Sequence, residues 1–228
     1  MILYTGDVHG DGGRFSPEGT PGEEKLGKGD YLAVAGDAGL VFWNEDLPRY
    51  AEGEALLDAL EKKPYTILFV DGNHENHRRL GEYPVEEWCG GRVHRIRKNI
   101  LHLMRGEIFE IDGVTLFAMG GAYSVDRYLR REGVSFWREE VPSGEELKRA
   151  GQNLVRHGLK VDVVLTHTAP TSIIQLMGYV PNEHDRELTG FLDWVFYDVK
   201  FEKWYFGHWH RHETFPRGAR CLYFDSAE

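Results

Sequence analysis

Two histidines two residues apart follow an apolar segment near the end of the sequence, which reads Gly207-His208-Trp209-His210. In an extended segment, residues i and i+2 point to the same side and lie roughly 6 to 7 Å apart. His208 and His210 can therefore reach two ions about 3.5 to 4 Å apart more easily than they can share one. The spacing favours a centre with two metal ions over a site with one.

Four other segments share this arrangement, because each predicted strand ends in an aspartate, asparagine or histidine within a residue or two. These residues are Asp7 with His9, Asp37, Asn73 with His74, and His167. Ligand sites of open α/β sheets collect at the carboxyl ends of the strands, and neighbouring glycines let the backbone stay close to a ligand. We therefore expect the five segments to converge on one site.

The donors in these segments are oxygen and imidazole nitrogen, without thiolates. Such a mixed set suits Mn, Fe, Zn, Co or Ni better than calcium, which prefers oxygen alone, or structural zinc, which usually takes cysteine. The two cysteines, Cys89 and Cys221, lie far apart and outside any Cys-x-x-Cys pattern. We expect both to be reduced and structural.

The elements that must position these residues are short apolar runs, bounded by glycine, aspartate or asparagine. They predict strands at residues 2–5, 31–35, 66–70, 92–96, 107–111, 114–119, 161–166, 203–206 and 221–224. Amphipathic patterns predict helices at residues 48–62, 143–157 and 187–199. The second of these helices opens with the capping-box pattern of Ser143 and Glu146.

This order of elements indicates an α/β fold with a partly antiparallel sheet. The length favours one domain over residues 1–228. Residues 10–29 and 120–143 are predicted to form two long surface loops, and loops of that length suggest a role in binding. The tryptophans expected in the core are Trp43, Trp88, Trp194 and Trp204.

Composition and charge disfavour several classes of protein. Hydrophobic residues make up 41% of the 228 residues and aromatic residues 13%, which is typical of a folded domain rather than a disordered chain. The net charge is −10, from 27 basic and 37 acidic side chains, and it repels nucleic acids and anionic membranes. No segment approaches the roughly 20 apolar residues of a membrane span, and residues 2–4 are strand-like rather than part of a signal peptide. We expect a cytoplasmic protein that binds neither membranes nor nucleic acids.

Taken in order along the chain, these motifs resemble the signature of the calcineurin-like metallophosphoesterases: Asp7-x-His9, Gly36-Asp37, Gly72-Asn73-His74-Glu75, His167 and Gly207-His208-x-His210. Residues 83–106 and 136–140 are similar to small bacterial and phage members that have no assigned substrate. The resemblance implies a four-layer α/β/β/α sandwich with mixed sheets and a metal site at the carboxyl ends of the strands. It also implies a dinuclear, metal-dependent phosphoric ester hydrolase.

The resemblance assigns the predicted ligands to two ions. Residue by residue, the sets are Asp7, His9 and His210 for one ion, Asn73, His167 and His208 for the other, and Asp37 as the bridge. Two divalent ions would neutralise an anionic phosphoester and lower the pKa of a bridging water enough to give an attacking hydroxide. His74 would protonate the leaving oxygen, an effect typically worth about 10²- to 10⁴-fold. Manganese is the expected activating ion.

The predicted substrate is a small phosphomonoester or phosphodiester, nucleotide-like in character. Residues expected to contact it are Asn73, Arg127 and Trp137. The arginine, with Arg130 and Arg131, would clamp a phosphate, and the tryptophan would stack on a ring. The acidic pair at 139–140 is expected to begin a helix or to face water.

Other functions remain open as alternatives. A nuclease is disfavoured by the net charge. The resembling protein Ser/Thr phosphatases carry a second aspartate three residues beyond the bridging one, where this sequence has Leu40. A non-catalytic metal-binding scaffold is disfavoured by the complete ligand set together with His74. The sequence carries no signal for an oligomeric state, and the histidines not expected to be ligands are His77, His94, His102, His157, His184 and His212.

Overall fold

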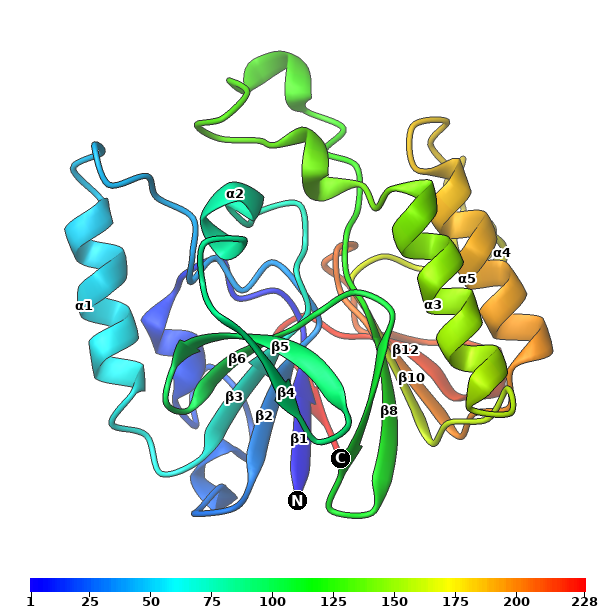
Figure 1. Cartoon of the computed structure of the whole chain (residues 1–228), viewed down its shortest axis with the longest axis horizontal. Coiled ribbons are helices and arrows are strands. Elements are labelled where there is room, and N and C mark those ends of the chain that lie inside the picture. Colours follow the sequence, from blue (N-terminus) through cyan, green and yellow to red (C-terminus); the bar gives the residue numbers. More distant parts are fainter.

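The computed structural model describes residues 1–228, which fold into strands, helices and short 3₁₀ turns (Figure 1). The strands are β1 Ile2–Thr5, β2 Tyr31–Val34, β3 Thr66–Phe69, β4 Val85–Trp88, β5 Gly91–Arg97, β6 Ile100–Leu103, β7 Glu107–Ile111, β8 Val114–Met119, β9 Val163–Thr166, β10 Lys203–Phe206, β11 Glu213–Thr214, β12 Ala219–Cys221 and β13 Ser226–Ala227. The helices are α1 Tyr50–Leu60, α2 His77–Leu80, α3 Gly144–Arg156, α4 Thr171–Leu176 and α5 Arg186–Asp198.

The strands form two mixed sheets. The seven-stranded sheet has the order β13-β1-β2-β3-β6-β5-β4, and the six-stranded sheet has the order β11-β12-β10-β9-β8-β7. The parallel strands β1, β2, β3 and β6 lie side by side in one sheet, and β8, β9, β10 and β12 do so in the other. Their carboxyl ends point the same way, toward the top of Figure 1.

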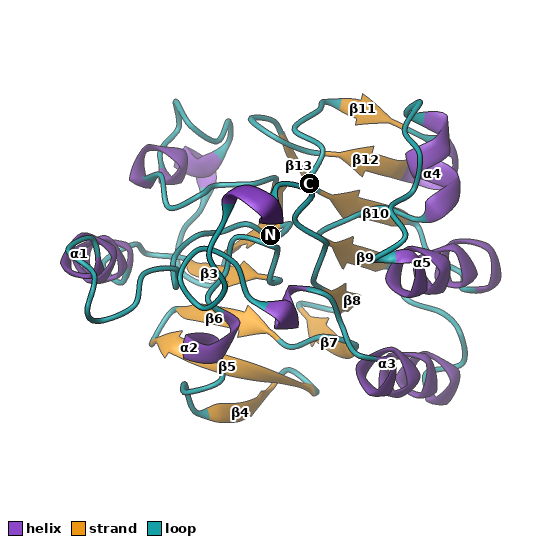
Figure 2. Cartoon of the chain, turned by 90° about the horizontal axis from the view of Figure 1, so that it is seen from above, coloured by secondary structure: helices purple, strands orange, loops and turns teal.

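Alternating side chains bury both faces of the central strands. In β2, Leu32 faces α1, whereas Ala33 faces the other sheet. This period of two explains why the strands read as continuous apolar runs. Seen from above, the layers are α1, the seven-stranded sheet, the six-stranded sheet, and then α3, α4 and α5 (Figure 2). The predicted α/β/β/α sandwich with mixed sheets is confirmed.

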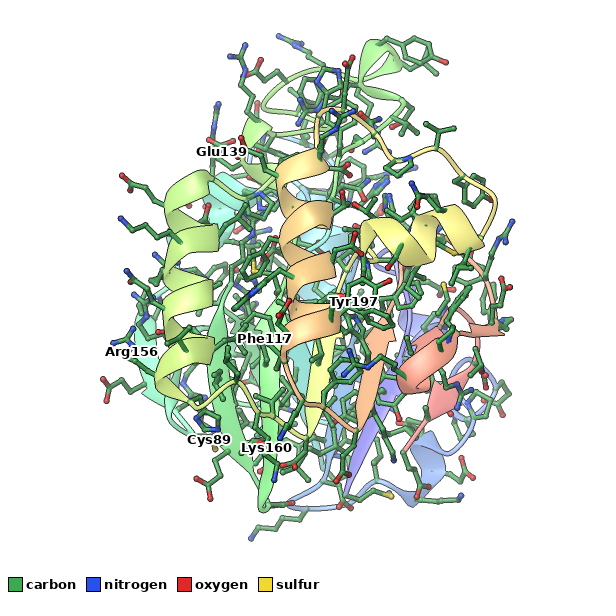
Figure 3. All side chains as sticks on the ribbon, turned by 90° about the vertical axis from the view of Figure 1, so that its right-hand side faces the viewer. Cys89, Phe117, Glu139, Arg156, Lys160 and Tyr197 are labelled. Carbon is green, nitrogen blue, oxygen red and sulfur yellow. The ribbon has the colours of Figure 1, made fainter.

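The outer layers are held by apolar contacts. Leu57 and Leu60 of α1 pack into the cluster on the seven-stranded sheet. On the other side, Leu154 of α3 and Leu192 of α5 pack against Phe117 of β8, which lies behind both helices in Figure 3. The predicted capping box at the start of α3 is present, because Ser143 and Glu146 bond each other's backbone N–H groups. None of the helices is long and apolar enough to cross a bilayer.

Several predicted boundaries were wrong. The last predicted strand, 221–224, is displaced to β12, and β9 begins two residues later than expected. Strands β4, β6, β11 and β13 were not predicted, and neither were the short helices α2 and α4. Of the four tryptophans expected in the core, only Trp204 is fully buried, whereas Trp43, Trp88 and Trp194 are partly exposed.

Residues 10–29 were predicted to be a surface loop, but part of this segment is buried. Phe15 belongs to the apolar cluster under α1. Arg14 is only 3% exposed, and it donates hydrogen bonds to the backbone oxygen of Asp7 and to Oγ1 of Thr5. Through these hydrogen bonds, the segment holds the end of β1 and the backbone of Asp7 in place.

Candidate metal centre

The five predicted segments meet at the carboxyl edge of the two sheets. Asp7 and His9 follow β1, Asp37 follows β2, and Asn73 and His74 follow β3, all in the seven-stranded sheet. His167 follows β9, and His208 and His210 follow β10 in the six-stranded sheet. Residues that are up to 203 positions apart, such as Asp7 and His210, come into direct contact. The site therefore lies where the two sheets adjoin.

Asp7, His9 and His210 form one group of ligand atoms. The Nε2 atoms of His9 and His210 lie 3.2 Å apart, and Oδ2 of Asp7 lies 2.9 Å from Nε2 of His210 and 3.8 Å from Nε2 of His9. Ligands held about 2.1 Å from one ion are separated by about 3.0 to 3.4 Å. Oδ2 of Asp7 is buried and accepts no well-directed hydrogen bond. The donor set and its spacing therefore fit a divalent cation.

A second group faces His167. Its Nδ1 lies 2.9 Å from the carbonyl oxygen of Ala35, and because a carbonyl only accepts, Nδ1 carries the proton and Nε2 is bare. This bare Nε2 faces two oxygens, Oδ1 of Asn73 at 3.1 Å and Oδ1 of Asp37 at 3.4 Å. Three acceptor atoms without a proton between them repel one another. A cation in their midst removes that repulsion, so this group also fits a metal ion.

Asp37 faces both groups. Oδ1 lies 3.4 Å from Nε2 of His167, whereas Oδ2 lies 4.0 Å from Nε2 of His9. Burial, together with the negative charges of Asp7 and Glu75, raises the pKa of this carboxyl well above its ordinary value. A cation bound nearby would stabilise the ionised form of this buried carboxylate.

His208 lies beside the second group. Its ring centroid is 5.0 Å from that of His167, and its backbone N–H donates to Oδ1 of Asp7 at 2.9 Å. Burial lowers the pKa of His208 to about 3. The imidazole is therefore neutral at physiological pH, as a metal ligand must be.

The backbone around these residues is locally strained. Left-handed φ angles are rare for residues other than glycine and cost of order 1 kcal/mol or more. Four of the predicted ligands adopt them, namely His9 (53°), Asp37 (46°), His208 (65°) and His210 (50°). Such strain gathers at functional sites because the surrounding structure must hold it.

Glycine is required beside Asp37. A Cβ atom added at Gly72 would lie 2.1 Å from Oδ1 of Asp37 and 2.8 Å from Nε2 of His167. Real Cβ atoms do not approach other atoms so closely, and any side chain here would displace the carboxylate of Asp37. The glycine of the Gly72-Asn73 pair is thus explained by the close packing of two strand ends.

The family model for calcineurin-like phosphoesterases matches residues 1–212. The chain belongs to the calcineurin-like phosphoesterase family. The match spans every predicted ligand, and the family depends on metal ions. No curated protein matches the sequence of this chain.

Two solved structures resemble the chain at low sequence identity. The phosphopantetheinyl hydrolase PptH of Mycobacterium tuberculosis is 17% identical, with a TM-score of 0.46, and the match covers 98% of this chain and 88% of that one. The sulfate thiohydrolase SoxB of Thermus thermophilus is 15% identical, with a TM-score of 0.42, and the match covers 86% and 34%.

Glu75 was quoted in a motif but was given no role by the sequence analysis. It is fully buried, and its carboxylate accepts hydrogen bonds from the N–H groups of Gly39 at 2.8 Å and Gly72 at 2.5 Å. Burial raises its pKa to about 8. Glu75 therefore ties the segment that carries Asp37 to the segment that carries Asn73. The signal in the sequence was its place in Gly72-Asn73-His74-Glu75, just after the apolar run of residues 66–70.

The structure does not support two of the predicted substrate contacts. Trp137 is 1% exposed, so its ring cannot stack on a substrate. Arg127 donates to the buried carboxylate of Glu140 at 2.8 Å and lies over the ring of Tyr123. Its guanidinium is thus engaged within the protein. Glu140 was expected to begin a helix or to face water. It lies in a short 3₁₀ helix, Arg138–Glu140, and is fully buried.

Instead, residues 120–143 orient Asn73. Glu140 accepts hydrogen bonds from the backbone N–H and the hydroxyl of Ser124, at 2.7 and 2.9 Å. The Ser124 hydroxyl in turn accepts a hydrogen bond from Nδ2 of Asn73 at 3.1 Å. This fixes the amide so that Oδ1, the atom able to bind a cation, points to His167.

We expect Ser124→Ala to weaken metal binding by about 10- to 100-fold, because groups that orient a ligand typically contribute that much. Mn²⁺ titration by calorimetry at constant pH measures the affinity. Ser172→Ala is a matched control, since the Ser172 hydroxyl bonds Asp193, which lies in α5 away from the site. An unchanged affinity in Ser124→Ala would show that Asn73 does not need this contact.

Arg130, rather than Arg127, is the arginine that reaches the site. Its Nη2 donates to Nε2 of His74 at 2.7 Å, and its Nε pairs with Asp126 at 2.8 Å. A guanidinium has no acceptor, so Nε2 of His74 is unprotonated in this contact. Burial, followed by the charge of Arg130, lowers the pKa of His74 to about 3. His74 also lies close to His9, with ring centroids 4.8 Å apart.

Three histidines that were not expected to be ligands gather around Asp71 instead. His102 contacts Oδ1 of Asp71 at 3.1 Å, His94 contacts His102, and His77 lies 3.9 Å from Oδ2. Arg105 binds the same carboxylate through two nitrogens. None of these side chains belongs to a group with metal-ligand spacing.

Proposed function

We propose that this chain is a dinuclear metal-dependent phosphoesterase that hydrolyses a small phosphomonoester or phosphodiester. The observation that carries the proposal is Asp37, whose two oxygens face separate groups of nitrogen and oxygen ligands. Asp7, His9 and His210 would hold one ion, and Asn73, His167 and His208 the other. When bound, the ions neutralise the phosphoester and activate water for attack. The nitrogen and oxygen donors suit Mn, Fe, Zn, Co or Ni, with manganese as the activating ion.

The remaining roles fall to His74 and Arg130. His74 lies at the edge of the ligand groups, where it can reach the leaving oxygen of a phosphoester. Arg130 holds Nε2 of His74 at 2.7 Å in the absence of substrate. A bound phosphate is a stronger partner for the guanidinium than an imidazole. The transfer of Arg130 to the phosphate would free Nε2 of His74 and remove the neighbouring positive charge. His74 could then take up a proton from water at Nε2 and pass it to the leaving oxygen.

The partner of His74 disfavours a protein Ser/Thr phosphatase. Where those enzymes carry an aspartate, this chain has Leu40, which is 2% exposed and packs in the apolar cluster under α1. His74 contacts a cation instead of a carboxylate. The net charge of −10 likewise disfavours a nuclease. We therefore propose a small phosphorylated substrate, without nucleic acid or membrane partners, and a place in the cytoplasm, where free thiols such as Cys89 and Cys221 persist.

The test is hydrolysis of p-nitrophenyl phosphate and bis-p-nitrophenyl phosphate with added Mn²⁺. We expect turnover of at least one of them, and its loss with a chelator. Failure to hydrolyse either would favour a non-catalytic scaffold. Cleavage of short single-stranded DNA at a comparable rate would favour the nuclease.

A further inference from the structure

A cavity of about 410 Å³ opens beside the ligand groups. It lies between the segment after β1, the segment after β2, and α1, with His9 and His74 in its wall. Its volume falls within the range of small-molecule sites. His74 is the proposed proton donor to the leaving oxygen. A leaving group that His74 protonates would therefore lie next to this cavity.

Two aromatic rings form a corner in this cavity. Phe42 and Trp43 meet at 87° with centroids 5.0 Å apart. Phe42 also lies nearly parallel to the ring of His74 and is supported from behind by the buried Trp137, at 5.5 Å and 86°. A planar group can therefore stack on one ring while its edge meets the other.

Two polar side chains that line the cavity, Arg49 and Glu52, are not engaged in hydrogen bonds or ion pairs within the protein. Both are exposed. The Arg49 guanidinium, itself a planar cation, lies 5.1 Å from the centroid of the Trp43 ring. The guanidinium of Arg49 thus shows that a flat group can stack on the Trp43 ring. Arg49 supplies hydrogen-bond donors, and Glu52 supplies acceptors.

We propose that this cavity binds the leaving group of the substrate and that this group carries a nitrogen heterocycle, as in a nucleoside monophosphate. The base would stack in the corner of Phe42 and Trp43 and bond Glu52 through an amino group, while the phosphate lies on the ligand groups beside His74. The proposal rests on the proposed phosphoesterase function. Stacking on Trp43 selects planar rings, whereas an alkyl or sugar leaving group would leave the corner unfilled.

The first test compares kcat/KM for AMP and ribose 5-phosphate with Mn²⁺. We expect AMP to be preferred by roughly 10-fold or more, the contribution of base stacking on an aromatic ring. In Trp43→Leu this preference should fall toward unity, because kcat/KM for AMP loses the contribution of stacking. Trp194→Leu is the matched control, because Trp194 is also partly exposed but lies on α5, in the opposite helical layer.

The second test is calorimetric binding of adenosine, which carries no phosphate and needs no turnover. Binding by the wild type and by Trp194→Leu, with loss in Trp43→Leu, would support the cavity as a base site even if no phosphoester were hydrolysed. That outcome would leave the cavity proposal standing while the phosphoesterase proposal failed. Equal kcat/KM for AMP and ribose 5-phosphate, with no adenosine binding by the wild type, would overturn the inference and leave the phosphoesterase intact.

Discussion

Asp37→Asn should lower kcat by about 10³-fold or more, because metal ions that activate water contribute several kcal/mol to the transition state. Asparagine keeps the size of the side chain but offers one oxygen and one NH₂ group, and the NH₂ group cannot bind a cation. It also removes the negative charge that two ligand groups share. The turnover of bis-p-nitrophenyl phosphate under saturating Mn²⁺ measures the loss.

The metal content should change together with the activity. We expect two Mn²⁺ per wild-type chain and one or none in Asp37→Asn, measured by mass spectrometry after gel filtration. Asp198→Asn, at the exposed end of α5, removes the same charge far from the site and should change neither value. An Asp37→Asn protein with two bound ions and full activity would contradict the role of Asp37 as the bridge.

His74→Ala should lower kcat by about 10²- to 10⁴-fold while both metal ions stay bound, because it removes a proton donor and no proposed ligand. The loss should be larger for phenyl phosphate than for p-nitrophenyl phosphate, since the poorer leaving group depends more on protonation. The comparison of the two substrates separates proton donation from a general loss of structure. The control is His212→Ala, because His212 is exposed and has no proposed role.

Full activity of His74→Ala toward phenyl phosphate would refute proton donation by His74. An equal loss on both substrates would instead point to a role in binding the phosphate. Because the backbone N–H of His74 donates to Oδ1 of Asp37 at 2.7 Å, and an alanine keeps this N–H, the substitution leaves that contact in place.

The ligand residues could be predicted from the sequence because each follows a recognisable strand directly in the chain. Each ligand segment lies directly after a short apolar run, and parallel strands bring their carboxyl ends to one edge. Asp37 and His167 could therefore be placed together without knowing the strand order. Strand β6 was missed because it follows β5 closely and because His102 interrupts its apolar run. By residue type, this histidine is more typical of a loop. Within the strand, the His102 side chain forms a hydrogen bond with Asp71.

The residues around the ligands were harder to predict because their partners lie far away in the chain. The arginines between residues 127 and 131 are equivalent by sequence, yet Arg127 pairs with the buried Glu140 and Arg130 reaches His74. Trp137 looks like a stacking residue by type, but the packing of residues 120–143 places it behind Phe42. The left-handed backbone at Asp37 likewise depends on neighbours from other strands.

The most direct test of the two-ion centre is anomalous diffraction from crystals of the protein grown with Mn²⁺. We predict two peaks about 3.5 to 4 Å apart, each about 2 Å from an oxygen of Asp37. One peak should lie against His9 and His210, and the other against Asn73 and His167. A single peak, or two peaks that Asp37 does not bridge, would contradict the account.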